Sequence, residues 1–559
     1  MKRISAIILS VIVFFGALAQ SGYALGGYEP EVHIQGGETF DYLGDHYYYF
    51  KTADSFASGS GTESDPYIVS SWEQLGLMRE YGCGSEGIGR YFVLDTDLYN
   101  TWVSVTELSA PVGFSSIGTE EKPFEGVFDA KGHKINAVAW FDEYLFGAVG
   151  ENGVVKNIKR HQGCGIAQVN HGLIEKCDVL TGVERTGTDN VGGIAGENTG
   201  IIKKCTVRRS GSGNDYNICA EGTGIGGIVG YNDGGTVSEC YSNILIRGTS
   251  SSRAIGGIAG DNSRGLIKDC VAEVRIETGG SETGGIAGRL NDGTIENCVV
   301  TGGWIAGSYE TVGSLIGGMY GDSKIVNCHA PDDYQHMITV GNATPETAEY
   351  GLKGAEMKTI STYKNFDFDN IWTMREGDFP ALYTMYKFPD TYKHWAKDHI
   401  EYLAERGIVS GYEDGTFRPD ENVTKAELII MACKAAQKAA RDDYNMAYED
   451  IPEWVMPYIE HFEFVYYKDA FKNLAVSDTI FGADNAATRL EAAVIAGAIR
   501  GEKRIGSKAP QYTDAGEIPT WAVDPIMISN LSGYEDGSFR PNKTVTRAEA
   551  AVMILSICK

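Results

Sequence analysis

A pattern of glycine pairs and alternating apolar residues recurs through the middle of the chain. Each copy has a Gly-Gly pair, an apolar residue, a polar turn, and a short stretch such as residues 294–300, in which β-branched and polar residues alternate. Such alternation is typical of a β-strand with one buried face, and Asn-Asp-Gly and Asn-Thr-Gly segments are typical turns. The fullest copies begin at Val191, Ile225, Ile255 and Thr283, and a looser copy begins at Val312.

A cysteine stands at the same place in six copies, three residues after an apolar residue. These cysteines recur at intervals of 28 to 35 residues and are Cys177, Cys205, Cys240, Cys270, Cys298 and Cys328. Ile158 takes this place in the first copy, so the position favours an apolar side chain rather than thiol chemistry. The total of 11 cysteines is odd, which argues against a fully paired disulfide framework.

One repeat cannot bury its apolar face alone, whereas stacked repeats bury a continuous core. The pattern therefore predicts a mainly β domain, a right-handed parallel β-helix. Its cysteines would form an inward ladder of free thiols, one strand spacing of about 4.8 Å apart.

These repeats resemble the GLUG motif of bacterial adhesin-like surface proteins. The resemblance begins with an opening segment at 59–69, continues through 91–98 and 124–133, and ends with a closing segment at 361–382. It covers residues 53–385, and it implies a β-helical domain displayed at a cell surface.

Glycine becomes scarcer after Pro389, and helical periodicity appears. A helix at 399–405 leads to the loop 409–419 and then to Thr424-Lys425-Ala426-Glu427, which precedes an apolar helix. Thr-x-x-Glu is a capping box, in which threonine and glutamate each bind a free backbone N–H at the helix start. The same order returns at 531–541 and 546–549, whereas a middle segment keeps Thr488-Arg489-Leu490-Glu491 but lacks the Gly-Tyr-Glu-Asp-Gly loop.

This C-terminal region resembles the S-layer homology (SLH) domain, which implies an all-α unit of three modules. The modules would be residues 387–445, 446–508 (degenerate) and 509–559. In that family, grooves between modules bind secondary cell-wall polysaccharide, which is often anionic and pyruvylated. The resemblance gives the contact with the acidic sugar to the basic residue after each capping threonine, which is Lys425, Arg489 or Arg547.

A cation in the first turn of a helix opposes the helix dipole, which favours a functional reason over simple solvation. Asp390, Trp395 and Trp521 are further candidates for carbohydrate binding. Trp395, Trp454 and Trp521 are either module core or groove wall, and core is favoured because tryptophan is mostly buried.

The N-terminus has the features of a secretory signal peptide at 1–19. Lys2 and Arg3 precede an apolar run at 7–18 that ends in Ala-Leu-Ala. The alternative, a transmembrane anchor, would need a longer run, so no membrane insertion is expected after cleavage. Residues 20–52 form an N-terminal segment with no motif we can interpret.

The formal net charge of −27 argues against nucleic acid as a partner. No zinc-ligand spacing or EF-hand pattern occurs, so we expect no metal or cofactor, and ordinary turn chemistry for the Asp and Asn residues. Asp129 with His133 is the nearest catalytic candidate, but Asp129 and the next three residues also fit a β-turn.

The sequence thus predicts a non-enzymatic protein of the bacterial cell wall or S-layer surface. The repeats would be adhesive or structural and could meet a host or neighbouring-cell ligand. One alternative is a wall-tethered polysaccharide-degrading enzyme, since fold does not fix function. Another is a plain spacer or S-layer constituent.

Overall fold

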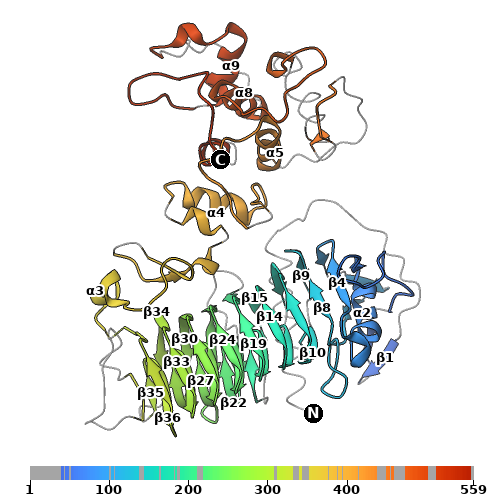
Figure 1. The fold of residues 1–559 in the computed structure, drawn as a ribbon, viewed down its shortest axis with the longest axis vertical. Coiled ribbons are helices and arrows are strands. Elements are labelled where there is room, and N and C mark those ends of the chain that lie inside the picture. Colours follow the sequence, from blue (N-terminus) through green and yellow to red (C-terminus); the bar gives the residue numbers. More distant parts are fainter. Residues whose placement is uncertain are drawn as a thin grey trace.

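The computed structural model describes residues 39–436, 448–500 and 512–555 with internal gaps, the longest at 137–143, 210–217, 332–338, 343–351 and 459–471. An array of short stacked strands occupies one end, and a smaller group of helices occupies the other (Figure 1). The signal peptide predicted at 1–19 lies outside the described residues.

Four parallel sheets form the walls of the array, which is a parallel β-solenoid of about seven turns. The 10-stranded sheet contains β3 (Tyr67–Val69), β4 (Tyr91–Leu94), β8 (Val127–Asp129), β11 (Val154–Lys156), β14 (Leu173–Glu175), β19 (Ile201–Lys203), β24 (Thr236–Ser238), β29 (Leu266–Lys268), β33 (Thr294–Glu296) and β37 (Lys324–Val326). The 7-stranded sheet contains β10 (Phe146–Val149), β13 (Ala167–Asn170), β18 (Ala195–Asn198), β23 (Val229–Asp233), β28 (Ala259–Ser263), β32 (Ala287–Asn291) and β36 (Ile316–Tyr320).

The other two solenoid sheets complete each turn. The 11-stranded sheet contains β16 (Val183–Glu184), β21 (Ile218–Ala220), β26 (Leu245–Gly248), β30 (Val271–Glu277), β25 (Tyr241–Asn243), β20 (Thr206–Arg209), β15 (Asp178–Thr181), β12 (Arg160–Gln162), β9 (Lys134–Asn136) and β5 (Leu98–Tyr99), and β34 (Val299–Ala306) pairs with β30. The 5-stranded sheet contains β17 (Val191–Gly192), β22 (Thr223–Gly226), β27 (Arg253–Gly256), β31 (Ser281–Gly284) and β35 (Val312–Gly313).

The register places equivalent repeat positions directly above one another, which builds the core. Ile174, Ile202 and Val237 are Cα partners on successive turns and are fully buried. After each of these strands a residue with positive φ, such as Asn297 at 50°, turns the chain and leads into the cysteine. The described cysteines are free, and those from Cys177 to Cys298 in this row are buried. The predicted ladder of buried thiols is therefore confirmed for these cysteines.

A second ladder inside the solenoid is polar. Asn170, Asn198, Asn232 and Asn262 are fully buried on successive turns. Each side-chain amide Nδ2 donates to the next asparagine Oδ1, at 2.7, 2.7 and 2.6 Å. The segments that the sequence pattern indicates as polar turns thus contain a buried row of hydrogen-bonded asparagines. These hydrogen bonds satisfy side-chain amides whose burial without a partner would be unfavourable.

Other elements cover the ends and one side of the solenoid. Helix α2 (Trp72–Tyr81) packs Leu75 and Met78 into the solenoid core near its N-terminal end. The closing segment contains α3 (Gly354–Met357) and the pair β38 (Trp372–Thr373) and β39 (Ala381–Leu382). The Trp372 Nε1–H donates to Asp269 Oδ1 at 3.0 Å, which ties this segment to the solenoid wall. A separate sheet joins β1 (Thr39–Tyr42), β2 (Asp45–Tyr49), β7 (Leu108–Gly113) and β6 (Trp102–Val105).

The C-terminal region is built of helices and loops around one apolar core. Phe417, Phe481 and Phe539, one from each loop before a capping threonine, are fully buried in it. Threonine and glutamate exchange both bonds of the predicted capping box in the first segment, at Thr424 and Glu427. The helices are α4 (Lys397–Glu405), α5 (Lys425–Ala435), α8 (Arg489–Arg500), α9 (Thr520–Ser529) and α10 (Arg547–Leu555).

Candidate functional site

A ring of backbone hydrogen bonds joins the three capping segments of the C-terminal region. Val423 N–H donates to Val545 O at 3.0 Å, Val545 N–H to Ala487 O at 2.9 Å, and Ala487 N–H to Val423 O at 2.9 Å. These three residues are buried. We name the segments first (388–436), second (448–500) and third (512–555), and each one contacts both of the others.

Lys425 of the first segment points into the second. Its Nζ donates to Leu474 O at 2.8 Å and Phe481 O at 3.1 Å. It also pairs with the capping glutamate Glu491 at 3.1 Å. The residue is only 4% exposed, so its ammonium group makes its contacts inside the protein.

Arg547 of the third segment points into the first in the same way. Its Nε donates to Phe417 O at 2.8 Å and its Nη2 to Ser410 O at 3.1 Å. Nη1 pairs with the capping glutamate Glu427 at 2.6 Å. The guanidinium lies 4.7 Å from the Tyr412 ring centroid, and the residue is 3% exposed.

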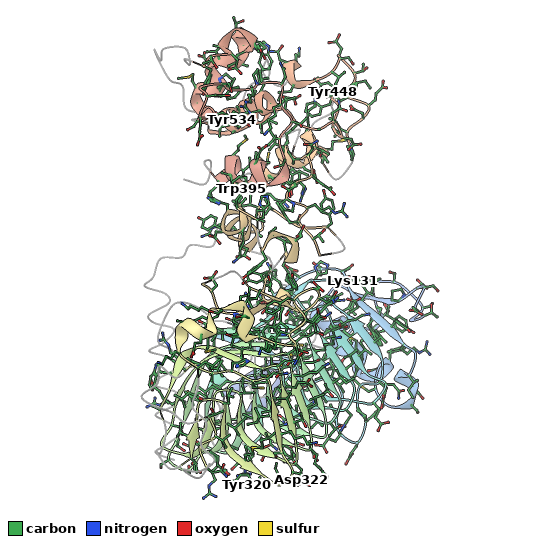
Figure 2. All side chains as sticks on the ribbon, turned by 60° about the vertical axis from the view of Figure 1, so that its left-hand side comes forward. Lys131, Tyr320, Asp322, Trp395, Tyr448 and Tyr534 are labelled. Atoms are coloured by element: carbon green, nitrogen blue, oxygen red, sulfur yellow. The ribbon has the colours of Figure 1, made fainter. Side chains whose placement is uncertain are left out.

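Arg489 of the second segment points into the third, but its contacts differ. Its Nη2 donates to Ser532 O at 2.6 Å, whereas its buried Nε has no hydrogen-bond partner. The guanidinium lies 4.7 Å from the Tyr534 ring centroid. The capping glutamate on this side, Glu549, pairs with Lys543 at 2.7 Å. Figure 2 shows Tyr534 in the helical part of the chain.

An aspartate holds each loop in place from the segment's start. Asp390 accepts from Phe417 N–H at 2.9 Å and Arg418 N–H at 2.6 Å. Asp450 and Asp514 bind the matching loops of the other two segments. Although burial acts to raise it, the pKa of both Asp450 and Asp514 is lowered by backbone N–H donors. Asp390 therefore binds backbone N–H groups of the loop in its own segment. The equivalent Asp450 of the degenerate segment was not predicted from the sequence.

The tryptophans do not share one environment. Trp395 is 64% exposed, so the expectation that it belongs to the module core is wrong (Figure 2). Trp521 is half-buried against the shared core. Trp454 lies outside the described residues. In the second segment, the lost Gly-Tyr-Glu-Asp-Gly loop is replaced by a turn that exposes Val476.

The solenoid's catalytic candidate separates into two local arrangements. Asp129 accepts from Lys131 N–H at 2.9 Å and from Asn157 Nδ2 at 2.8 Å. His133 Nδ1 lies 3.1 Å from Asp97 Oδ1 instead. These contacts favour the turn interpretation. Among the described residues, no group of three or more His, Cys, Asp or Glu side chains is placed to hold a metal ion.

A polar cluster that the sequence did not reveal joins the 7-stranded sheet to β31 of the 5-stranded sheet. Arg289 donates to Asp261 Oδ2 at 3.0 Å and pairs with Glu282. Tyr320 OH donates to Glu282 at 2.6 Å, and Ser263 OH to Asp261 at 2.9 Å. Burial raises the pKa of Asp261. Against burial, hydrogen bonds from Arg289 and Tyr320 lower the pKa of Glu282.

Comparison with known proteins identifies part of the chain. The S-layer homology domain matches residues 387–429 and 531–551. The exoglucanase XynX of Acetivibrio thermocellus is 29% identical over 181 residues, which are 30% of this chain and 16% of that protein. An S-layer protein of Bacillus licheniformis is 26% identical over 30% of this chain and 19% of its own. A cellulosome-anchoring protein of A. thermocellus is 36% identical over 12% of this chain and 16% of its own.

The chain thus spans less than a fifth of these relatives, at 16%, 19% and 16%. Because both an enzyme and S-layer proteins match, the matched part does not decide whether the remainder is catalytic. No helix among the residues described is long and apolar enough to cross a membrane. The chain contains an S-layer homology domain, and the matches support a secreted bacterial protein attached to the cell surface.

Proposed function

We propose that residues 387–559 form three SLH modules that bind an anionic, pyruvylated cell-wall polysaccharide without a covalent bond. The observation that carries this proposal is the cyclic placement of Lys425, Arg489 and Arg547, one at each boundary between segments. The chain has a formal net charge of −27, so attachment to an acidic polymer requires local cations.

The chemistry of these boundaries suits an acidic sugar. Arginine offers a planar fork to a carboxylate, and a tyrosine ring offers a face to a pyranose. Tyr412 and Tyr534 each lie beside an arginine fork, at 4.7 Å from Arg547 and Arg489 respectively. A lysine boundary, at Lys425, provides only a point charge.

The solenoid is proposed as the displayed part, with an adhesive or structural role. Tyr320 and Asp322, at the tip of the strands β36 and β37, lie at the opposite end of the molecule from Tyr534 (Figure 2). Attachment through the helical end would direct this tip away from the wall. A host or neighbouring-cell ligand would meet the solenoid there.

Cosedimentation tests the anchor. The full chain should sediment with purified wall sacculi, and prior chemical removal of the acidic secondary polymer should abolish sedimentation. Free pyruvylated oligosaccharide should compete, whereas the same sugar without its ketal should not. Unchanged binding to stripped sacculi would refute attachment through this polymer.

A second candidate function is a wall-tethered polysaccharide hydrolase, and the cluster around Arg289 is the observation that favours it. Two carboxyl groups with oppositely shifted pKa values can divide acid and base roles. Asp261 and Glu282 both contact the Arg289 guanidinium, and a hydrolase would need one of the two carboxyl groups as the acid and the other as the base. Release of reducing sugar from wall or plant polysaccharides, lost in D261N and E282Q, would establish this activity.

A further inference from the structure

The three boundaries are not equivalent, and resting on the proposed function we infer that the acidic glycan binds at one of them. This is the Arg489 boundary, formed by Arg489, Tyr534, Arg540 and Lys543. The other two boundaries are occupied by carboxylates of the protein itself. The three cations differ in the groups that already bind them.

Two boundaries are closed by internal ion pairs. Lys425 contacts Glu491 at 3.1 Å and two carbonyl oxygens, and the loop beside it has lost its tyrosine. Arg547 contacts Glu427 at 2.6 Å and also two carbonyl oxygens. Both cations are almost wholly buried, at 4% and 3% exposure. A ligand carboxylate would have to displace a partner that is already desolvated, which is unfavourable.

The Arg489 boundary lacks such an internal partner. By analogy with Glu427 and Glu491, Glu549 should pair with Arg489, but it lies 2.7 Å from Lys543 instead. Lys543 stands four residues after Phe539, where the first segment has Glu421 and the second has Asn485. One lysine in the third segment therefore draws the glutamate away and leaves the guanidinium without a carboxylate among the described residues.

The unsatisfied atoms of Arg489 indicate a place for a ligand. Its Nε is buried and makes no hydrogen bond, which is unfavourable for a polar group. The side chain as a whole is only half-buried, unlike Lys425 and Arg547. A ligand carboxylate could accept from the exposed part of this guanidinium while the sugar ring packs near Tyr534.

The three boundaries also differ in how many cations and carboxylates are in contact. At the Arg489 boundary three cations, Arg489, Arg540 and Lys543, meet two carboxylates, Asp536 and Glu549. At the Arg547 boundary two cations meet two carboxylates, since Arg418 also pairs with Glu421. At the Lys425 boundary one cation meets one carboxylate. Among the ion pairs of the described residues, the Arg489 boundary has one more cation than carboxylates, whereas the other two boundaries are balanced.

The cations of this boundary are arranged around the ring of Tyr534. Arg489 lies 4.7 Å from the ring centroid and Arg540 lies 4.2 Å from it. Lys543 Nζ donates to the Tyr534 hydroxyl at 3.1 Å. Because these contacts hold the ring and both guanidinium groups in place, little order need be lost on binding. The ligand class is a saccharide bearing a carboxylate, either a pyruvate ketal or a uronic acid.

The test compares matched variants of the full chain on wall sacculi, with thermal unfolding measured in parallel. Arg489→Met should weaken binding at least about tenfold, as expected for a charged hydrogen bond, with little change in the unfolding temperature. Arg418→Met, at the first-segment position that corresponds to Arg540, should bind within about threefold of the wild type, because Arg418 lies at the boundary that Glu427 already closes.

A third variant tests the reason for the difference. Lys543→Asn, which copies the second segment, should release Glu549 to Arg489 and weaken binding about as much as Arg489→Met. Competition with a pyruvylated saccharide and with a uronic-acid oligosaccharide distinguishes the two carboxylate sources.

The outcomes separate the two proposals. Failure of the wild type to bind sacculi would refute the anchoring function itself. Wild-type binding that is equally strong in Arg489→Met would overturn the assignment to this boundary. So would a loss of binding in Arg418→Met as large as that in Arg489→Met.

Discussion

The asparagine ladder allows a test of how buried polar groups stabilise the solenoid. We consider Asn198→Leu in the middle of the ladder and Asn262→Leu at its end. Leucine is the natural replacement, since Leu290 occupies the same position on the turn after Asn262. Leucine and asparagine are also similar in length, so the change is mainly one of hydrogen bonding.

The middle position has more bonds to lose. Asn198 accepts from Asn170, and its Nδ2 donates to Asn232 Oδ1 at 2.7 Å and Gly200 O at 3.2 Å. Its loss leaves the buried Asn232 Oδ1 without a donor, whereas Gly200 O keeps the Thr236 N–H at 2.8 Å and Asn170 Nδ2 keeps Gly172 O at 3.3 Å. The unsatisfied acceptor costs about 1–3 kcal/mol and the two other lost bonds about 1 kcal/mol each, while the added leucine burial returns about 1.5–3 kcal/mol. The expected net loss of stability is about 1–3 kcal/mol.

Asn262, at the end of the ladder, makes fewer hydrogen bonds than Asn198. Asn262 accepts from Asn232 and donates to Gly265 O at 3.0 Å. In its leucine variant, Asn232 Nδ2 keeps its bond to Gly235 O at 3.0 Å, and the new side chain packs against Leu290. We expect a loss of about 0–2 kcal/mol here.

Urea unfolding of the full chain, followed by circular dichroism in the strand region, measures the difference. The midpoint of the solenoid transition should fall clearly more for Asn198→Leu than for Asn262→Leu. Equal shifts in the two variants would show that the number of broken inter-turn bonds does not set the stability, and our reasoning would be refuted.

Three further predictions concern a core cysteine, two aspartates that bind loops, and a capping threonine. Cys270→Val should change stability by less than about 1.5 kcal/mol, whereas Cys270→Asp should abolish the solenoid transition in the same urea assay, because a buried charge has no partner there. Because the folded-state pKa of Asp450 and Asp514 is lowered, their stabilisation is present above about pH 3.9 and lost as pH falls below it; acid titration of D450N/D514N should therefore be flatter than that of the wild type. Thr488→Ala should cost about 1 kcal/mol in thermal unfolding of the helical region, and no change would show that Glu491 alone caps α8.

The solenoid could be predicted because its information is periodic. Apolar residues recur at the positions of Ile202 and Cys205 in successive copies, and stacking turns each position into a continuous row. The asparagines could not be placed in the same way. Asn232 stands in a segment that also fits an exposed turn, and only the register shows that its side chain points inward.

The candidate site was predicted in part. The motif located Lys425, Arg489 and Arg547, because the residue after a capping threonine can be read from local spacing. Their partners come from other segments, more than 40 residues away in the chain for Arg489 and Ser532. Local sequence patterns do not show which distant segments contact each other. The different contacts of the three cations could therefore be seen only in the structure.

The ring of hydrogen bonds among Val423, Val545 and Ala487 has a mechanical consequence. If the C-terminal region is the anchor, as proposed, tension on the solenoid would reach it through the chain just before the first segment. Because that segment is bonded to both of the others, it cannot be peeled away on its own. A pull on the first segment would therefore be passed on to the second and the third.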